Sequence, residues 1–410
     1  MRGTSTIGGA NTAPLILIDG VPGDFNTVAP EDVESIDVLK DGSAAAIYGT
    51  RGTNGVILIT TKQARGAEML KVDYSGYIST SKISRKHEML SAAEFAQLYP
   101  DYDYGYDTDW VDEITRTPVS HVHNVSLTGG TSRSNYVANL NYASRQGIMK
   151  RSNFENLRAR IEVTQRLFDD KVRLRLGLLG RSDWRESTVN GGSFRGVAYS
   201  QATRRNPTEP VRNEDGTWYE NLSKFEYENP VALLTECDGD VKNTHFQWIA
   251  GVTYNPVRDV TLQANYSYSR FTSNRGYSET LNHISARRDG YNGWSSVGSS
   301  ISIEKLLEVT AQYDGSFGAN KFTVLGGYSY NENDYEGIWI DNWGFQDDNF
   351  GGWHNIGIGS ALKNGKANVG SNKSITNLIG FFGRATYSYD NRYLLMAALR
   401  YEGASQLWRS

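Results

Sequence analysis

The sequence contains almost no cysteine, no long apolar run and little excess charge. Cys237 is the single cysteine, which excludes an internal disulfide and a cysteine-rich metal site. No stretch approaches the roughly 18 apolar residues that a membrane-spanning helix requires, and the mean hydropathy is -0.51. The net charge of -4 is spread over 410 residues without a lysine or arginine tract, so we expect no nucleic-acid partner.

The first ten residues, MRGTSTIGGA, also lack the apolar segment of a secretory signal peptide. We therefore expect either a protein that is not exported or a piece of a longer one. The missing apolar runs do not exclude the membrane. Strands of a β-barrel cross it with about 9 to 11 residues in which apolar and polar side chains alternate.

Tyrosine, glycine and alternating polarity are abundant instead. Aromatic residues make up 12% of the chain, with 25 tyrosines, and 42 glycines can supply turns. Between Val260 and Ser269, apolar residues at 260, 262, 264, 266 and 268 alternate with polar ones, which places the two kinds on opposite faces of a strand. About eleven segments follow this pattern from Leu70 onward.

The lengths of the strands and of their connections favour a membrane barrel over a soluble sandwich. The alternating segments run for around ten residues, whereas strands of soluble proteins have about five or six. Short turns at 168–170, 256–259, 318–320 and 390–391 contrast with long polar stretches near 183–242, 271–300 and 332–374. Barrels with short periplasmic turns and long external loops have this asymmetry.

The N-terminal segment has a different pattern. Leu15–Ile18, Val33–Leu39 and Val56–Thr61 are short apolar or β-branched runs that predict strands, and the alanine-rich Ser43–Tyr48 predicts a short helix. Asp19-Gly20 predicts a turn after the first strand. We expect a small α/β unit here.

The block from Pro14 to Lys62 carries a family resemblance. It contains PLILIDGVPG and, after a variable loop, PEDVESIDVLKDGSAAAIYGTRGTNGVILITTK. This block closely resembles the plug of TonB-dependent outer-membrane receptors of the SusC/RagA type, almost position by position. TDWVDEI (Thr108 to Ile114), the segment from His123 to Ile161, and RRNPTEPVRNEDGTWY (Arg204 to Tyr219) resemble further family segments in the same order.

The resemblance implies a mainly β protein: a transmembrane antiparallel β-barrel, with about 22 strands in a complete member, and a small α/β plug domain in the lumen. We expect residues 1–66 to form the C-terminal part of the plug. Residues 67–410 would form the N-terminal part of the barrel, roughly half of it. The front of the plug, the TonB box and the remaining strands would then lie outside this chain.

The resemblance further implies TonB-dependent active import of a nutrient across the Gram-negative outer membrane, in contact with its lipid. The nutrient would be an oligosaccharide or other glycan, or a peptide. The implied partners are a SusD-like surface lipoprotein and the TonB-ExbB-ExbD complex. Two alternatives remain open: a passive porin or adhesin-type barrel, and a soluble all-β carbohydrate-binding protein.

Candidate site residues fall into three groups. Arg158, Arg160 and Glu162 lie on the polar face of one strand, from which they could hydrogen-bond with the plug. Loop aromatics could stack on sugar rings or serve as girdle residues: Trp218, Tyr219, Trp294, Trp339, Trp343 and Trp353. The resemblance marks a structural plug motif: Asp19, Gly20, Lys40, Asp41, Tyr48, Gly49, Arg51 and Gly55.

Other candidate sites are weak. DYDYGYDTD (Asp101 to Asp109) resembles a calcium-binding loop, but its glycine stands one position too early and the closing glutamate is missing, which favours a polar loop. His121 and His123 share a strand face without a third local ligand. No Ser-His-Asp or paired-carboxylate arrangement stands out, so we expect no enzyme, cofactor or metal.

Overall fold

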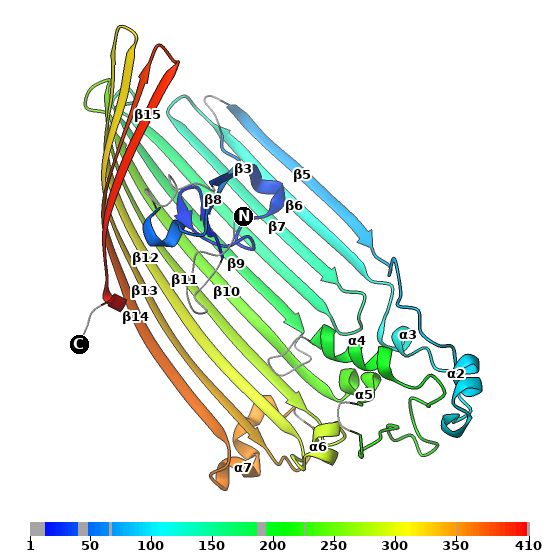
Figure 1. Cartoon of the computed structure of the whole chain (residues 1–410). Helices are drawn as coiled ribbons and strands as arrows, with labels where there is room; N and C mark the ends of the chain where they lie inside the picture. Colours follow the sequence, from blue (N-terminus) through cyan, green and yellow to red (C-terminus); the bar gives the residue numbers. More distant parts are fainter. Residues whose placement is uncertain are drawn as a thin grey trace.

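The computed structural model describes residues 13–39, 48–64, 68–186, 194–224, 227–349 and 351–407. One large, curved β-sheet carries a small domain against one of its faces (Figure 1). We call the sheet the wall, its covered face the inner face, and the small domain, which corresponds to the predicted plug, the plug.

The wall contains eleven antiparallel strands, each paired with its neighbours in sequence. The mainly β class and the count of about eleven strands are confirmed. The strands are β5 (Glu68–Thr80), β6 (Val119–Gly130), β7 (Ser134–Gln146), β8 (Asn153–Leu167), β9 (Val172–Glu186), β10 (Cys237–Tyr254), β11 (Val260–Glu279), β12 (Trp294–Phe317), β13 (Asn320–Trp343), β14 (Asn368–Tyr389) and β15 (Tyr393–Ala404).

Alternation divides each strand between the two faces of the wall, as β8 illustrates. Leu157, Ile161 and Val163 are 46%, 50% and 42% exposed on the outer face. Arg158 and Arg160 are buried on the inner face. An exposed apolar outer face opposite a polar inner face is the arrangement of a barrel wall that borders lipid.

The two ends of the wall differ in their connections (Figure 1). Short turns close one end, at 131–133, 168–171, 255–259, 318–319 and 390–392. The opposite end, called the helical end, carries α2 (Ala92–Leu98), η3 (Pro100–Tyr102), α3 (Trp110–Ile114), α4 (Phe194–Arg204), α5 (Pro230–Thr235), α6 (Ile284–Arg288), η4 (Gly352–Ile358) and α7 (Ser360–Lys363); η5 (Ser405–Leu407) follows β15. None of the helices in the described ranges combines the length and the apolar character that crossing a membrane requires.

The strands are longer than predicted, and two of the loops are shorter. β12 and β13 have 24 residues each. The loop predicted near 271–300 spans only 280–293 in the structure, and the loop predicted near 332–374 spans only 344–367. Both faces of these extensions carry polar residues, so the period-two contrast on which the prediction relied disappears there.

A long connection between β5 and β6, residues 81–118, was missing from the predicted loops. It contains α2, whose N-terminus is a capping box: the Ser91 hydroxyl accepts from the Glu94 backbone N–H, and the Glu94 carboxylate accepts from the Ser91 N–H. The pattern of a serine followed three residues later by a glutamate is visible in the sequence and would have indicated this helix.

The plug contains β1 (Leu15–Ile18), β2 (Val21–Pro22), η1 (Pro30–Asp32), β3 (Val33–Leu39), η2 (Gly49–Gly52) and β4 (Val56–Thr61). Its sheet has the order β2-β1-β4-β3, with β1 and β4 parallel. The three predicted strands are confirmed with their predicted bounds. Most of the predicted helix, and the predicted boundary at residue 66, lie outside the described residues, so the division into domains stays a prediction.

The edges of the wall lead to a prediction about the chain on its own. Within the described residues, β5 and β15 each pair with a single neighbour, and β15 exposes Leu394 and Leu399 at 81% and 78%. Unpaired edges and uncovered apolar faces promote association. We expect the 410-residue chain expressed alone to aggregate in size-exclusion chromatography; a monodisperse, protease-resistant product in detergent would contradict this.

Candidate functional site

The connection between plug and wall fixes the orientation of the plug. β4 ends at Thr61, and β5 starts at Glu68, opposite Gly130 at the short-turn end of the wall. Since β1 runs parallel to β4, the Asp19-Gly20 turn that follows β1 also faces the short-turn end. The starts of β1 and β4 therefore face the helical end.

A buried ion pair joins the two parts. Asp32 ends η1 in the plug, and Arg160 projects from β8; their side chains are 2% and 8% exposed. Arg160 Nε donates to Asp32 Oδ2 at 2.5 Å, and its Nη2 donates to Oδ1 at 2.9 Å and to the Lys62 carbonyl at 2.9 Å. The two-pronged geometry holds the plug in one orientation, because guanidinium and carboxylate match only when coplanar.

A second group of arginines extends this contact along β8 and β9. Arg175 lies 3.4 Å from the Asp19 carboxylate, and Arg181 Nη1 lies 3.2 Å from that of Asp24. Arg158 Nε donates to the Asn26 carbonyl at 2.7 Å. Four arginines of the wall thus hold the plug, and three of them pair with its acidic side chains.

The plug also makes an apolar contact and reaches a distant strand. Leu179 of β9 packs with Ile18 and Ile59 of the plug. On another part of the wall, the Thr50 backbone N–H donates to Glu402 Oε2 of β15 at 2.9 Å. Contacts with both early and late strands hold the plug across the curve of the wall (Figure 1).

The prediction that polar residues of β8 hydrogen-bond with the plug is confirmed for Arg158 and Arg160. Glu162 instead accepts from Arg175 Nη2 at 2.7 Å and lies 3.5 Å from Arg160 Nη1. It therefore orients the arginines that hold the plug. Sequence alternation identified the inner face but could not show which residues reach across.

The predicted plug motif includes the positions that shape the turns. Asp19 and Gly20 have φ of 50° and 87°, and Asp19 accepts from both the backbone and the hydroxyl of Thr61. Tyr48 directly precedes η2, and Gly49, the first residue of η2, has φ of 65°. Arg51 lies in η2, Gly55 precedes β4 with φ of 95°, and Lys40 and Asp41 lie outside the described residues.

Gly49→Ala should loosen the plug from β15. A Cβ at this left-handed position would meet the carboxylate of Glu402, which holds the backbone of Thr50. Gly105→Ala is the matched control, because Gly105 also has a left-handed φ, of 82°, but open space around it. In the complete protein, we expect faster hydrogen exchange over 49–55 in the first variant only; equal rates in both would contradict the contact's role.

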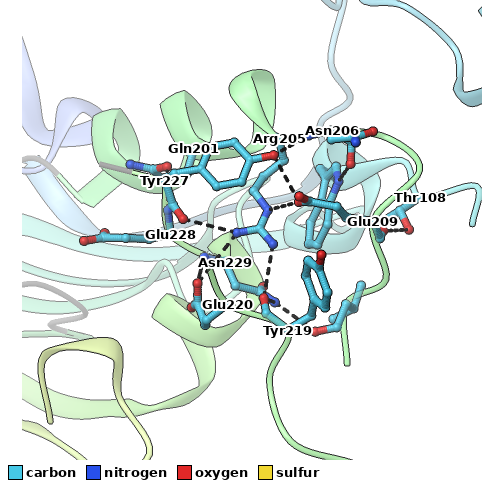
Figure 2. A network of polar contacts seen from close by, with 12 residues as sticks. Thr108, Gln201, Arg205, Asn206, Glu209, Tyr219, Glu220, Tyr227, Glu228 and Asn229 are labelled. Carbon is cyan, nitrogen blue, oxygen red and sulfur yellow. Dashed lines mark hydrogen bonds and ion pairs between the residues drawn. The ribbon is translucent and has the colours of Figure 1, made fainter. Parts of the chain in front are cut away.

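At the helical end, Arg205 lies at the centre of a buried polar network (Figure 2). Its side chain is fully shielded from solvent, with Nε 3.1 Å from Glu209 Oε2 and Nη1 3.6 Å from Glu220 Oε2. Nη2 donates to the Tyr219 carbonyl at 3.1 Å, and Nη1 donates to that of Tyr227 at 3.3 Å. A single cation thus lies beside two buried carboxyl groups, those of Glu209 and Glu220.

This network joins two connections that are far apart in sequence. The Arg205 guanidinium lies 4.9 Å from the ring centre of Trp110, and Trp110 Nε1 donates to the Asn206 carbonyl at 2.9 Å. We call the described residues of 81–118 and 194–236 the loop unit. The TDWVDEI and RRNPTEPVRNEDGTWY segments are in contact here. Neither segment, taken alone, predicts this contact.

Burial raises the pKa of Glu220 to about 7, although Asn229 N–H donates to it and Arg205 lies close. The folded loop unit therefore binds a proton more tightly than the unfolded one. Its stability should fall as pH rises from about 4.5 to about 7 and stay level above that range. Hydrogen-exchange protection of the loop unit, corrected for intrinsic rates, should decrease over this pH range. In the Glu220→Gln variant the protection should no longer depend on pH in this range. A variant that keeps the wild-type pH dependence would contradict the conclusion that Glu220 causes it.

The predicted loop aromatics occupy two regions of the helical end. Trp218 and Tyr219 belong to the loop unit, where Trp218 is 6% exposed and donates to Glu236 Oε1 at 2.7 Å. The other four lie around β12 and β13, where Trp294 stands opposite Trp343 in register. Trp339 is 41% exposed on β13, and Trp353 in η4 donates to Asp238 Oδ2. Their role in ligand binding stays a prediction.

A wall with an apolar outer face, whose inner face holds a folded domain through buried ion pairs, has the arrangement of a plugged β-barrel protein. The plug occupies the side of the wall where a barrel has its lumen. Among the described residues, no group of three or more His, Cys, Asp or Glu side chains is placed to hold a metal ion.

Comparisons with known proteins agree with this class. Residues 1–56 match the TonB-dependent receptor plug domain family. The chain is 29% identical to TonB-dependent receptor SusC of Bacteroides thetaiotaomicron, covering 99% of this chain and 43% of SusC. It is 28% identical to TonB-dependent receptor P3 of Formosa agariphila, covering 99% of this chain and 40% of that receptor.

Solved structures share the fold. The RagAB peptide transporter superposes with a TM-score of 0.83 at 20% identity, over 100% of this chain and 50% of that one. The ferric citrate transporter FecA superposes with a TM-score of 0.62 at 12% identity, over 96% of this chain and 48% of that one. The chain is therefore similar to TonB-dependent receptors such as SusC, and it spans less than half the length of the curated relatives it matches.

Proposed function

We propose that the complete protein imports an oligosaccharide or a peptide across the outer membrane, driven by TonB. The observation that carries this proposal is that buried ion pairs such as Asp32–Arg160 hold the plug against the inner face. A lumen obstructed in this way needs an energy source to open. A passive porin has no use for such a domain.

The proposal has three further parts. The protein resides in the outer membrane, with the exposed apolar face of the wall in lipid and the helical end outside the cell. Its partners are a SusD-like surface lipoprotein and the TonB-ExbB-ExbD complex, reached through a TonB box. It binds and moves its substrate without chemical change. The names TonB-dependent receptor SusC and RagAB peptide transporter support the dependence on TonB and the transport of a substrate.

Uptake of labelled oligomers by cells that express the complete protein tests the proposal. A panel of oligosaccharides and peptides should contain at least one that accumulates in cells with functional TonB and not in cells that lack it. Deletion of a neighbouring lipoprotein gene should reduce this uptake. Equal uptake with and without TonB would overturn the proposal in favour of passive diffusion.

A further inference from the structure

A cavity of about 700 Å³ lies between the plug and strands β10, β11 and β12 of the wall. Its lining includes Leu15, the first residue of β1, and Asn54, two residues before β4, and the starts of both strands face the helical end. The cavity therefore lies on the outward side of the plug, where a ligand that enters from the helical end would meet it. Side chains that line it include Asp24, Arg51, His245, Phe271 and Glu304.

Two of these side chains bring buried nitrogen atoms without hydrogen-bond partners among the described residues. Arg51 of η2 has no partner at Nε or Nη1, and both atoms are shielded from solvent. His245 of β10 is 8% exposed. Its Nε2 lies 2.7 Å from the hydroxyl oxygen of Ser269, whereas its Nδ1 is buried without a partner. Buried polar atoms left in this state are costly, and they mark positions where a further group can bind.

The acidic side chains of the lining already have donors. Asp24 Oδ1 accepts from the Asn26 backbone N–H at 2.6 Å and from Arg181 Nη1 at 3.2 Å. Glu304 Oε1 accepts from Asn331 Nδ2 at 2.8 Å. The hydrogen-bonding groups of the cavity that remain available to a ligand are therefore mainly the N–H donors of Arg51.

The surroundings of Arg51 also favour an acidic ligand over a basic one. Glu308 of β12 lies close enough to interact with its charge, but no hydrogen bond joins Glu308 to Nε or Nη1. Phe271 adds an apolar ring to the lining, with the Arg181 guanidinium 5.8 Å from its centre. A guanidinium with free N–H groups beside an apolar surface suits a carboxylate attached to an organic chain.

We propose that this cavity binds a carboxylate group of the imported oligomer, with Arg51 as its main donor and His245 as a second contact. The inference rests on the proposed import function and narrows its substrate class to acidic oligomers. A peptide with a free C-terminus and a glycan that contains uronic acid present the same group.

Calorimetry on the complete protein in detergent tests the proposal with paired probes. One pair is an oligopeptide with a free C-terminus and its C-terminal amide; the other is an oligogalacturonate and its methyl ester. For one of the two pairs, the free carboxylate should bind at least about tenfold more tightly than the capped form. The pair that discriminates identifies the source of the carboxylate.

Variants of Arg51 and His245 test whether these residues cause the preference for the free carboxylate. Arg51→Gln should remove the preference for the free carboxylate while binding of the capped form changes little. Arg392→Gln, at an exposed turn between β14 and β15, is the matched control and should retain the preference. If Arg51→Gln fails to insert, His245→Gln decides the matter, and it should weaken binding of the free carboxylate alone.

The outcomes separate this proposal from the import function. Equal affinity for free and capped probes, or a preference that survives in the Arg51 and His245 variants, would overturn the carboxylate site and leave import untouched. TonB-independent uptake would overturn the import function whatever the probes show.

Discussion

Asp32→Asn in the complete protein is expected to displace the plug from the inner face of the wall and to make the outer membrane permeable to large solutes. The amide cannot neutralise Arg160, whose side chain is 8% exposed, so the substitution removes the carboxylate that accepts from both Nε and Nη2 and leaves Glu162, 3.5 Å from Nη1, as the acidic neighbour. Breaking a buried pair in this way costs about 3 to 5 kcal/mol. Sensitivity of cells to an antibiotic too large for porins would measure the leak.

Two controls assign the leak to the charge. Arg160→Met combined with Asp32→Asn should largely restore the barrier, because a neutral, well-packed pair often replaces a buried ion pair at little cost. Asp73→Asn removes one partner of the exposed Lys71–Asp73 pair on β5 and should leave the barrier intact. Equal permeability of the Asp32 and Asp73 variants would contradict the role of the buried pair.

The second large effect concerns the helical end. Arg205→Met should unfold the loop unit without unfolding the wall, because it leaves Glu209 and Glu220 buried and without their shared cation. We expect a loss of about 3 to 5 kcal/mol in the local stability of this unit. Limited proteolysis should then cleave within 81–118 and 194–236 while the heat-modifiable barrel band persists in electrophoresis.

The control for this variant is Arg392→Met. The Arg392 side chain is 79% exposed, and its ion pair with Asp390 lies at the opposite end of the wall. It should retain the wild-type cleavage pattern. Resistance of the Arg205 variant to proteolysis would show that other contacts suffice to hold the loop unit.

The sequence predicted most of the fold because its main signals are local. Period-two alternation marked the inner and outer faces of β8, and apolar runs marked β1, β3 and β4 with their observed bounds. The predicted strand ends were less accurate where both faces carry polar residues, as in the half of β13 nearer the helical end, whose segment from Asn331 to Gly337 contains no aliphatic side chain.

The candidate site depends on contacts that local patterns do not encode. Alternation placed Arg158 and Arg160 on the inner face, but the choice of Asp32 as partner depends on how the plug is seated. In the loop unit, Trp110 and Arg205 meet across 95 positions of sequence, and nothing in either segment indicates its partner. The cavity beside Arg51 depends in the same way on where the plug lies against β10 to β12.

The central claim is that the plug closes the lumen of the complete protein until energy is supplied. Swelling of liposomes that contain the purified complete protein, in isotonic solutions of small sugars and without TonB, tests it most directly. The account predicts no swelling above that of protein-free liposomes, with swelling gained in the Asp32→Asn variant. Rapid swelling with the wild-type protein would contradict the account and indicate an open pore.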